Sequence, residues 1–180
     1  MISHHTDTIE TATMSSNIES FHNLSNKWTL WAHLPHNTDW SIKSYIPIST
    51  FTTIEETLAV TETMPSILVE NCMLFMMKEG IKPTWEDPKN RNGGCFSFKV
   101  TNKVVPNVWR NLYYALCGET LFLEQKYNKH ANGITISPKK NFCIIKIWLD
   151  TAKYQDPNII IDIPNLSKQG CLFKKHEPEF

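Results

Sequence analysis

The chain has 180 residues, of which 41% are hydrophobic and 20% charged, a composition typical of a soluble domain with one core. Its formal net charge of +0 excludes a strongly basic nucleic-acid binder, so any contact with RNA must depend on a few local cations. Its apolar runs are far shorter than the roughly 18 residues of a membrane span, and the N-terminus lacks the pattern of a signal peptide.

The cysteines argue against a disulfide or metal framework. They are odd in number and widely spaced, without a C-x-x-C pair or a histidine at metal-ligand spacing, at Cys72, Cys95, Cys117, Cys143 and Cys171. We therefore expect buried free thiols in the reducing environment of the cytosol or nucleus, with no metal and no cofactor.

The chain divides into a tail and one domain. Residues 1–20 are rich in Ser, Thr and His without a periodicity that could bury a face, so we expect a disordered tail. Apolar residues become dense from Phe21, and no later stretch has the length and composition of a linker. A single domain over residues 21–180 is therefore predicted.

The first part of this domain is predicted as two strands and a helix. Trp28–Leu34 alternates and is aromatic, which favours a strand, and Tyr45–Ser49 is similar. Thr53-Ile54-Glu55-Glu56 has the form of a capping box, in which the Thr hydroxyl and the Glu three residues later satisfy free amides at a helix start. We expect this helix to end near Met64, before Pro65.

The second part adds strands and one amphipathic helix. Cys72–Met77 is a buried apolar run, and Cys95–Thr101 alternates after two glycines, so both are predicted strands. Pro106 suits a first helical turn, and apolar residues at three-to-four spacing predict a helix up to Gly118. Segments rich in β-branched residues predict strands at Gly133–Ile136, Phe142–Leu149 and Asn158–Ile163. This order favours an α+β fold, an antiparallel sheet with helices on one face.

Two of the six tryptophans lie outside every predicted element. Trp40 lies in a polar segment, and Trp85 lies in a loop where Glu86 follows it. A single loop tryptophan most often folds back onto the core. Two such indoles can instead hold a flat cation between their faces, each contributing roughly 0.5 to 2 kcal/mol by cation–π attraction or stacking.

A guanine methylated at N7 is such a cation. Its N1–H and N2 amino group are adjacent donors, and the carboxylate of Glu86 can accept both in a charge-assisted pair. The backbone amide of Trp85 is placed to reach O6. Unmethylated guanine has the same donors without the charge, so the stacked indoles are expected to discriminate between the two bases.

These residues belong to a longer series of ordered motifs. Through these motifs, from about His22 to Ile163, the chain resembles the eukaryotic translation initiation factor 4E family of cytoplasmic mRNA cap-binding proteins. The motifs are Asn26-Lys27-Trp28-Thr29-Leu30-Trp31, Trp40, Gly80-Ile81-Lys82-Pro83-Thr84-Trp85-Glu86-Asp87 with Asn90 and Gly93-Gly94, Trp109 with Gly118-Glu119, and Lys146-Ile147-Trp148.

The resemblance implies a curved antiparallel sheet backed on its convex face by two long helices, with the cap slot on the concave side. It implies a cytoplasmic protein, expected to be a monomer, that captures capped mRNA for translation initiation. Trp40 and Trp85 would stack on the cap base, Glu86 would bind the guanine edge, and Trp148 would contact the N7-methyl group. The tryptophans inside the other predicted elements are expected in the core, namely Trp28, Trp31 and Trp109.

The chain departs from the family where an arginine and a lysine hold the cap triphosphate. Ungapped alignment places Lys139 at the arginine position and Ile144 at the lysine position. A lysine point charge replaces a bidentate fork, so the phosphates should be held more loosely, with Lys140 as compensation. Further candidates for the phosphate contacts are Lys168, Lys174 and Lys175. The alternative for each of them is an ordinary solvated charge on the surface.

A second departure concerns the convex face, where the family binds a helical peptide of initiation factor 4G or of inhibitory proteins. Leu58 and Asn111 stand where the family has a tryptophan and a glutamate, whereas His22, Ile54 and Tyr114 keep the general character. Losing an aromatic anchor and a charge at a binding hot spot should weaken the binding of an ordinary partner. We therefore expect a scaffold partner that is similar to factor 4G but divergent. Tight binding of a standard 4G peptide in a pull-down would refute this.

A third departure is a short connection after Trp148. Residues 149–157 are too few for the third helix of the family, which is therefore expected to be missing. Such trimming, in a chain rich in Asn, Ile and Lys, suits a fast-evolving lineage such as a viral one.

Three other functions stay open at this point. A cap-binding repressor would hold the cap without recruiting the usual scaffold, and the changes at Leu58 and Asn111 are compatible with it. A cap-modifying enzyme would need clustered metal-binding carboxylates or a glycine-rich turn after a strand, and the sequence has neither pattern, so we expect no enzyme. An interaction module that has lost its ligand is disfavoured because the four cap residues occur together.

Overall fold

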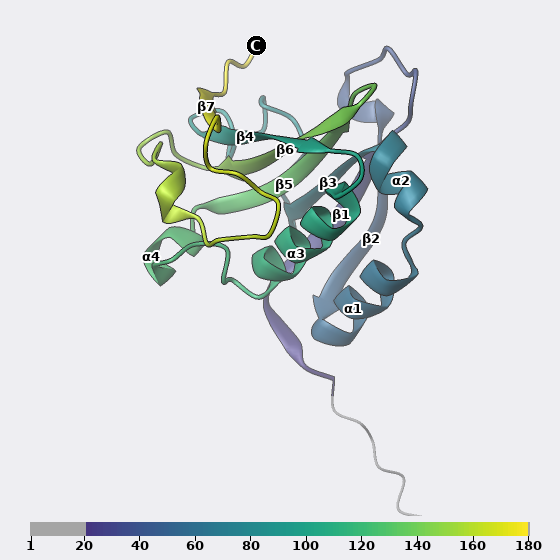
Figure 1. Cartoon of the computed structure of the whole chain (residues 1–180), viewed down its shortest axis with the longest axis horizontal. Coiled ribbons are helices and arrows are strands. Elements are labelled where there is room, and N and C mark those ends of the chain that lie inside the picture. Colours follow the sequence, from purple (N-terminus) through teal and green to yellow (C-terminus); the bar gives the residue numbers. More distant parts are fainter. Residues whose placement is uncertain (1–20, 180) are drawn as a thin grey trace, which may run out of the picture.

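The computed structural model describes residues 21–179, which form one curved antiparallel sheet with helices on one of its faces (Figure 1). The seven strands lie in the order β2-β1-β3-β5-β6-β4-β7. They are β1 (Asn23–His33), β2 (Tyr45–Thr53), β3 (Met73–Lys78), β4 (Gly94–Thr101), β5 (Ala131–Pro138), β6 (Phe142–Leu149) and β7 (Leu172–Lys175). The helices are α1 (Ile54–Thr63), α2 (Ser66–Asn71), α3 (Val105–Cys117) and α4 (Gln125–Asn128), with 3-10 helices at Ile42–Ser44 and Pro157–Ile159. The predicted α+β class is confirmed, whereas the predicted tail over residues 1–20 lies outside the described residues.

The main core lies between the sheet and the helices. The amphipathic helix predicted after Pro106 is α3, which buries Trp109 and Leu112 against the strands. Successive strand residues point to opposite faces of a sheet. Ile145 and Ile147 of β6 therefore join this core, while Trp148 belongs to a smaller apolar cluster elsewhere. This alternation leaves the face of the sheet opposite the helices available for a site.

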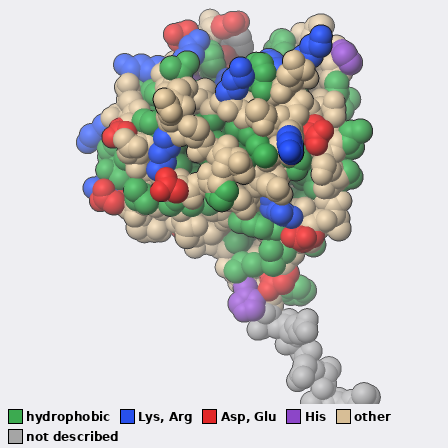
Figure 2. Space-filling model, in the orientation of Figure 1, with side chains coloured by type: hydrophobic (Ala, Val, Ile, Leu, Met, Phe, Trp, Pro, Cys, Tyr) green, Lys and Arg blue, Asp and Glu red, His purple; other side chains and the backbone are tan. Residues whose placement is uncertain are grey.

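The surface agrees with the charge balance of the sequence. Figure 2 shows acidic and basic side chains interspersed over the visible face, as a net charge of +0 leads one to expect. Within residues 21–179, no helix combines the length and the apolar character needed to cross a membrane. The five cysteines are free thiols, but the prediction that they are buried holds only for Cys95, Cys117 and Cys143, since Cys72 and Cys171 are half-buried.

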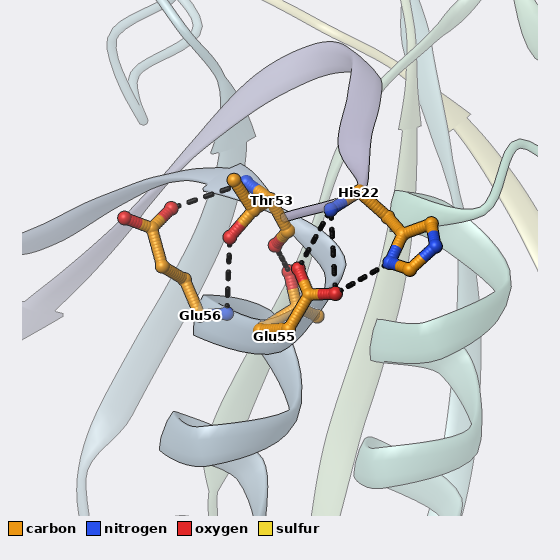
Figure 3. Close-up of polar contacts among 5 residues, drawn as sticks. His22, Thr53, Glu55 and Glu56 are labelled. Carbon is orange, nitrogen blue, oxygen red and sulfur yellow. Dashed lines mark hydrogen bonds and ion pairs between the residues drawn. The ribbon is translucent and has the colours of Figure 1, made fainter. Parts of the chain in front are cut away.

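The predicted capping box forms at the start of α1. The Thr53 hydroxyl accepts a hydrogen bond from the Glu56 amide at 3.2 Å, and the Glu56 carboxylate accepts one from the Thr53 amide at 3.1 Å (Figure 3). Hydrogen bonds from Thr52, and then from Thr53, hold the pKa of Glu56 below its usual range. The box joins the end of β2 directly to the helix and so fixes where α1 leaves the sheet.

Thr53→Ala is expected to lower the free energy of unfolding by about 1 kcal/mol, because the Glu56 amide loses its acceptor. Thr63→Ala is a matched control in the last turn of α1, where an exposed hydroxyl donates to the carbonyls of Ala59 and Val60 and caps no free amide. Urea denaturation followed by circular dichroism measures both variants. Equal effects of the two substitutions would contradict a specific role for the cap.

One predicted strand is wrong. Asn158–Ile163 is not a strand of the sheet, because Pro157–Ile159 forms a 3-10 helix and only Ile160 makes a bridge, to Phe122. The carbonyl of Leu121 and the amide of Leu123 satisfy the backbone on either side of that bridge. The β-branched residues that suggested a strand are used for packing instead, since Ile160 and Ile163 are buried in the main core.

Three short elements were not predicted from the sequence. They are the helices α2 and α4 and the edge strand β7. β7 extends the sheet beyond β4, with Gly94 opposite Lys175 and Ser97 opposite Leu172. This pairing brings the C-terminal segment to the face of the sheet that lies away from α3.

Candidate functional site

A cavity of about 590 Å³ lies on the face of the sheet opposite α3. Its apolar base is a small cluster that contains Phe75, Cys95 and Trp148, with Tyr45 and Trp85 packed against it. The wall comes from the β1–β2 and β3–β4 connections, strands β2, β3, β5 and β6, and the segment after β7. It is lined by Trp40, Ser41, Tyr45, Met73, Phe75, Pro83, Thr84, Trp85, Glu86, Thr135, Ser137, Lys146, Trp148 and Glu179. All four residues assigned to the cap base in the sequence analysis therefore border one cavity.

Trp40 is the exposed indole of the cavity. Its side chain is 58% exposed, and its ring stacks on the ring of His33 with a centroid separation of 4.3 Å and an interplanar angle of 4°. His33 is buried, and its Nε2 lies 2.9 Å from the carbonyl oxygen of Asp39. The stacked imidazole supports the indole and fixes its plane at the cavity wall.

Trp85 lies in a loop that a buried polar network holds in place. The Asp87 carboxylate accepts hydrogen bonds from the amides of Lys82 and Lys89, each at 2.9 Å. Asn90, which is fully buried, donates to the carbonyls of Lys82 and Thr84. These bonds close the loop on both sides of Trp85 and set its position before any ligand binds.

Asn132 ties this loop to the sheet. Its side-chain amide, on β5, donates to the carbonyl of Lys89 at 2.8 Å and to the side-chain oxygen of Asn90 at 2.9 Å. The residue is buried, with 3% of its surface exposed. Its side chain therefore couples the floor of the cavity to the loop that carries Trp85.

Asn132→Ala is expected to lower the free energy of unfolding by about 1 to 3 kcal/mol, because the buried side-chain oxygen of Asn90 and the part-buried carbonyl of Lys89 lose their donor. We also expect weaker ligand binding, since the Trp85 loop loses its attachment to β5. Thermal unfolding and ligand titration measure the two effects. The exposed substitution Asn158→Ala is the control, and equal destabilisation by both would argue against the network.

His176 is a member of the site that the sequence did not reveal. Its ring stacks on Trp85 at 5.6 Å and 17°, and lies 4.7 Å from the ring of Trp148. Its Nδ1 donates to the carbonyl of Asn90 at 2.7 Å, and burial lowers its pKa below the usual range. The pairing of β7 with β4 brings His176 here, and no local pattern in the sequence predicts that pairing.

Glu86 borders the cavity beside Trp85 with its carboxylate free of protein partners. Among residues 21–179 it makes no hydrogen bond and no ion pair, so both oxygens can accept from a ligand. Tyr45 lies on the other side of the cavity base, and burial, with a smaller effect of the Glu86 charge, raises its pKa to about 12. The phenol therefore stays protonated near neutral pH.

The candidate phosphate residues lie in different places. Lys139 and Lys140 are exposed at the β5–β6 turn, where the Lys139 amide donates to the carbonyl of Phe142, and neither lines the cavity. The Lys174 ammonium is 5.2 Å from the centre of the Trp85 ring and 3.5 Å from the carboxylate of Glu177. Lys175 is exposed on β7, and Lys168 pairs with Asp162 at 2.7 Å.

The remaining tryptophans divide largely as predicted. Trp28 and Trp109 are each 1% exposed in the main core. Trp31 is half-buried and packs against the cluster beneath the cavity, so it supports the site and not the main core. The structure thus separates two core indoles from four that border or support the cavity.

The residues predicted to bind a partner lie on α1 and α3, except His22, which precedes β1 and contacts α1. Ile54 and Leu58 of α1 are 44% and 43% exposed. The His22 ring lies 2.6 Å from the Glu55 carboxylate (Figure 3), and hydrogen bonds from His22 hold the pKa of that carboxyl below its usual range. The two helices are joined where the Tyr114 hydroxyl, one turn after half-buried Asn111, donates to Glu62.

Comparison with known proteins agrees with this architecture. The family model for eukaryotic initiation factor 4E matches residues 23–177. The initiation factor 4E of Eremothecium gossypii is 31% identical over 169 residues, which span 90% of this chain and 74% of that protein. A homologue from Acanthamoeba polyphaga mimivirus is 28% identical over 135 residues, which span 63% of this chain and 50% of that protein. A schistosome initiation factor 4E, solved with m7GpppG and a 4E-binding protein, has a TM-score of 0.67 at 27% identity, over 75% of both chains. The chain therefore belongs to the eukaryotic initiation factor 4E family.

Proposed function

We propose that this protein binds the 7-methylguanosine cap of mRNA and recruits capped mRNA for translation initiation. The observation that carries the proposal is the cavity bordered by Trp40, Trp85, Glu86 and Trp148. The schistosome relative is bound to a cap dinucleotide, and the family assignment makes the same ligand class the natural one here.

The proposed base contacts follow from the chemistry of the wall. The cationic methylguanine stacks between Trp40 and Trp85, where the electron-rich faces of the indoles attract its charge. The free carboxylate of Glu86 accepts from N1–H and from the N2 amino group. Trp148, at the base of the cavity, contacts the N7-methyl group.

The proposed phosphate contacts begin at the β5–β6 turn. Lys139 and Lys140 are exposed there and are free to move toward a triphosphate that extends out of the cavity. Their contribution is electrostatic and therefore weakens as salt is added. An arginine fork at the same place would hold the phosphates more rigidly.

The proposed partner surface is the exposed apolar strip of α1 together with α3. It comprises His22, Ile54, Leu58, Asn111 and Tyr114, and it would receive a scaffold protein similar to initiation factor 4G but divergent from it. The schistosome structure contains a 4E-binding protein, which supports a protein partner for this fold. We propose that the protein acts in the cytoplasm, as a monomer, and not as an enzyme.

A cap-binding repressor is the second candidate. Leu58 and Asn111 give the partner surface neither a large aromatic anchor nor a charge, and both are common in binding hot spots. Such a protein would hold the cap and fail to recruit the scaffold. A translation assay in an extract of the protein's own host separates the two, since stimulated translation of capped mRNA supports the initiation factor and inhibited translation supports the repressor.

The test of cap binding is a fluorescence titration with m7GTP and GTP. Stacking on two indoles should quench tryptophan emission strongly with m7GTP. GTP should bind at least about tenfold more weakly, because it lacks the cationic ring. Equal affinity for the two nucleotides, or no quenching by either, would refute the proposed function.

A further inference from the structure

The floor of the cavity contains polar groups that the proposed base contacts do not use. Thr135 and Ser137 lie on β5 and Lys146 lies on β6, and all three line the cavity. Thr135 and Lys146 are directly opposite each other in the antiparallel pair, so their side chains leave the sheet on the same face. Lys146 also shares this face with Trp148, two residues later.

Thr135 carries a buried hydroxyl that has no partner in the described part of the chain. The side chain is 2% exposed, and its oxygen makes no hydrogen bond. Buried polar groups in folded proteins are nearly always hydrogen-bonded. Because Thr135 also lines the cavity, a molecule bound there would be a partner for this hydroxyl.

Lys146 adds a positive charge that the protein does not neutralise. Within residues 21–179 its ammonium makes no ion pair and no hydrogen bond, and it lies 5.9 Å from the centre of the Trp85 ring. Its neighbour on β4 is Ser97, which is neutral. Because the side chain is half-buried, its charge is partly desolvated and would gain from an anion in the cavity.

The other lysines considered near the cavity do not combine a place in its wall with an unpaired charge. Lys174 is engaged by Glu177 at 3.5 Å, and Lys139 and Lys140 lie outside the cavity wall. The carboxylates in the wall belong to Glu86 and Glu179, and neither is ion-paired with Lys146. The cavity floor thus brings together one ammonium and two hydroxyls.

We propose that Lys146, with the hydroxyls of Thr135 and Ser137, binds the phosphate nearest to the methylguanosine, an inference that rests on the proposed function. Ammonium and hydroxyl donors form charge-assisted hydrogen bonds with phosphate oxygens. The Lys146 ammonium lies 5.9 Å from the centre of the Trp85 ring on which the base is proposed to stack, so we assign to it the phosphate closest to the base. Lys139 and Lys140 are left to bind the distal phosphates.

The test compares 7-methylguanosine with its 5′-monophosphate, m7GMP, in titrations of the wild type and of Lys146→Met. In the wild type, the phosphate should strengthen binding about tenfold. Lys146→Met should abolish this gain while leaving the affinity for the nucleoside unchanged, and Thr135→Val should remove part of it. Lys153→Met is the matched control, because that exposed lysine lies 5.5 Å from the Tyr154 ring, outside the cavity.

A phosphate gain that survives Lys146→Met would overturn the inference. So would an equal loss of affinity for nucleoside and nucleotide, because it would indicate damage to the stacking slot. Failure of the wild type to bind 7-methylguanosine and m7GMP at all would be a different result, since it would refute the proposed function and the inference with it.

Discussion

Trp85→Ala should lower the affinity for m7GTP by at least about tenfold, because the base loses one of its two stacking faces. Glu86→Gln should cost about 1.5 to 3 kcal/mol of binding free energy, the range for hydrogen bonds to a charged group. The glutamine places an amide donor where the guanine edge also presents donors. Fluorescence or calorimetric titration with m7GTP measures both variants.

Trp85→Ala and Glu86→Gln share one control, an exposed carboxylate outside the cavity wall. Glu79→Gln removes an exposed carboxylate 3.9 Å from Lys27, outside the cavity wall, and should leave m7GTP affinity unchanged. Trp85→Ala and Glu86→Gln should also change different properties of binding. Trp85→Ala should reduce the preference for m7GTP over GTP, whereas Glu86→Gln should lower the affinity for both nucleotides. Wild-type affinity in either variant would remove that residue from the site.

Trp109→Ala should lower the free energy of unfolding by about 3 to 5 kcal/mol, the usual cost of truncating a buried indole. Trp109 is 1% exposed on α3 and packs in the main core, so its loss leaves a cavity beneath the helix. Guanidinium denaturation followed by circular dichroism measures the effect. At that cost, a domain of ordinary stability would be close to unfolding.

Trp40→Ala is the matched comparison for this prediction. Its indole is 58% exposed, so its removal should change the free energy of unfolding by less than about 1 kcal/mol. The same substitution should abolish much of the quenching by m7GTP. If both substitutions destabilised the fold equally, Trp40 would be a core residue and not a wall of the slot.

Local patterns were sufficient to predict most of the elements. The capping box at Thr53 and the apolar spacing after Pro106 each depend on residues within one helix, and both helices form as predicted. The Asn158–Ile163 prediction failed because β-branched residues are common both in strands and in buried segments without regular secondary structure. The partner of a strand, here a single bridge from Ile160 to Phe122, is not encoded locally.

In the candidate site, too, some residues are predicted by local sequence patterns and others depend on long-range pairing. Trp40 and Trp85 could be found because an indole is unusual in a polar loop, and Glu86 because it directly follows one of them, and the structure brings all three to one cavity. His176 could not be found, since the polar segment around it joins the sheet only through long-range pairing with β4. Lys146 had a usable signal, because a residue two positions before Trp148 on a strand must share its face.

The most direct measurement is a crystal structure of the protein grown with m7GTP. We predict that the methylguanine plane lies between the rings of Trp40 and Trp85, with its N1 and N2 donors toward the carboxylate of Glu86. A base found outside this slot, or a slot closed by its own side chains at saturating ligand, would contradict cap binding between the two indoles.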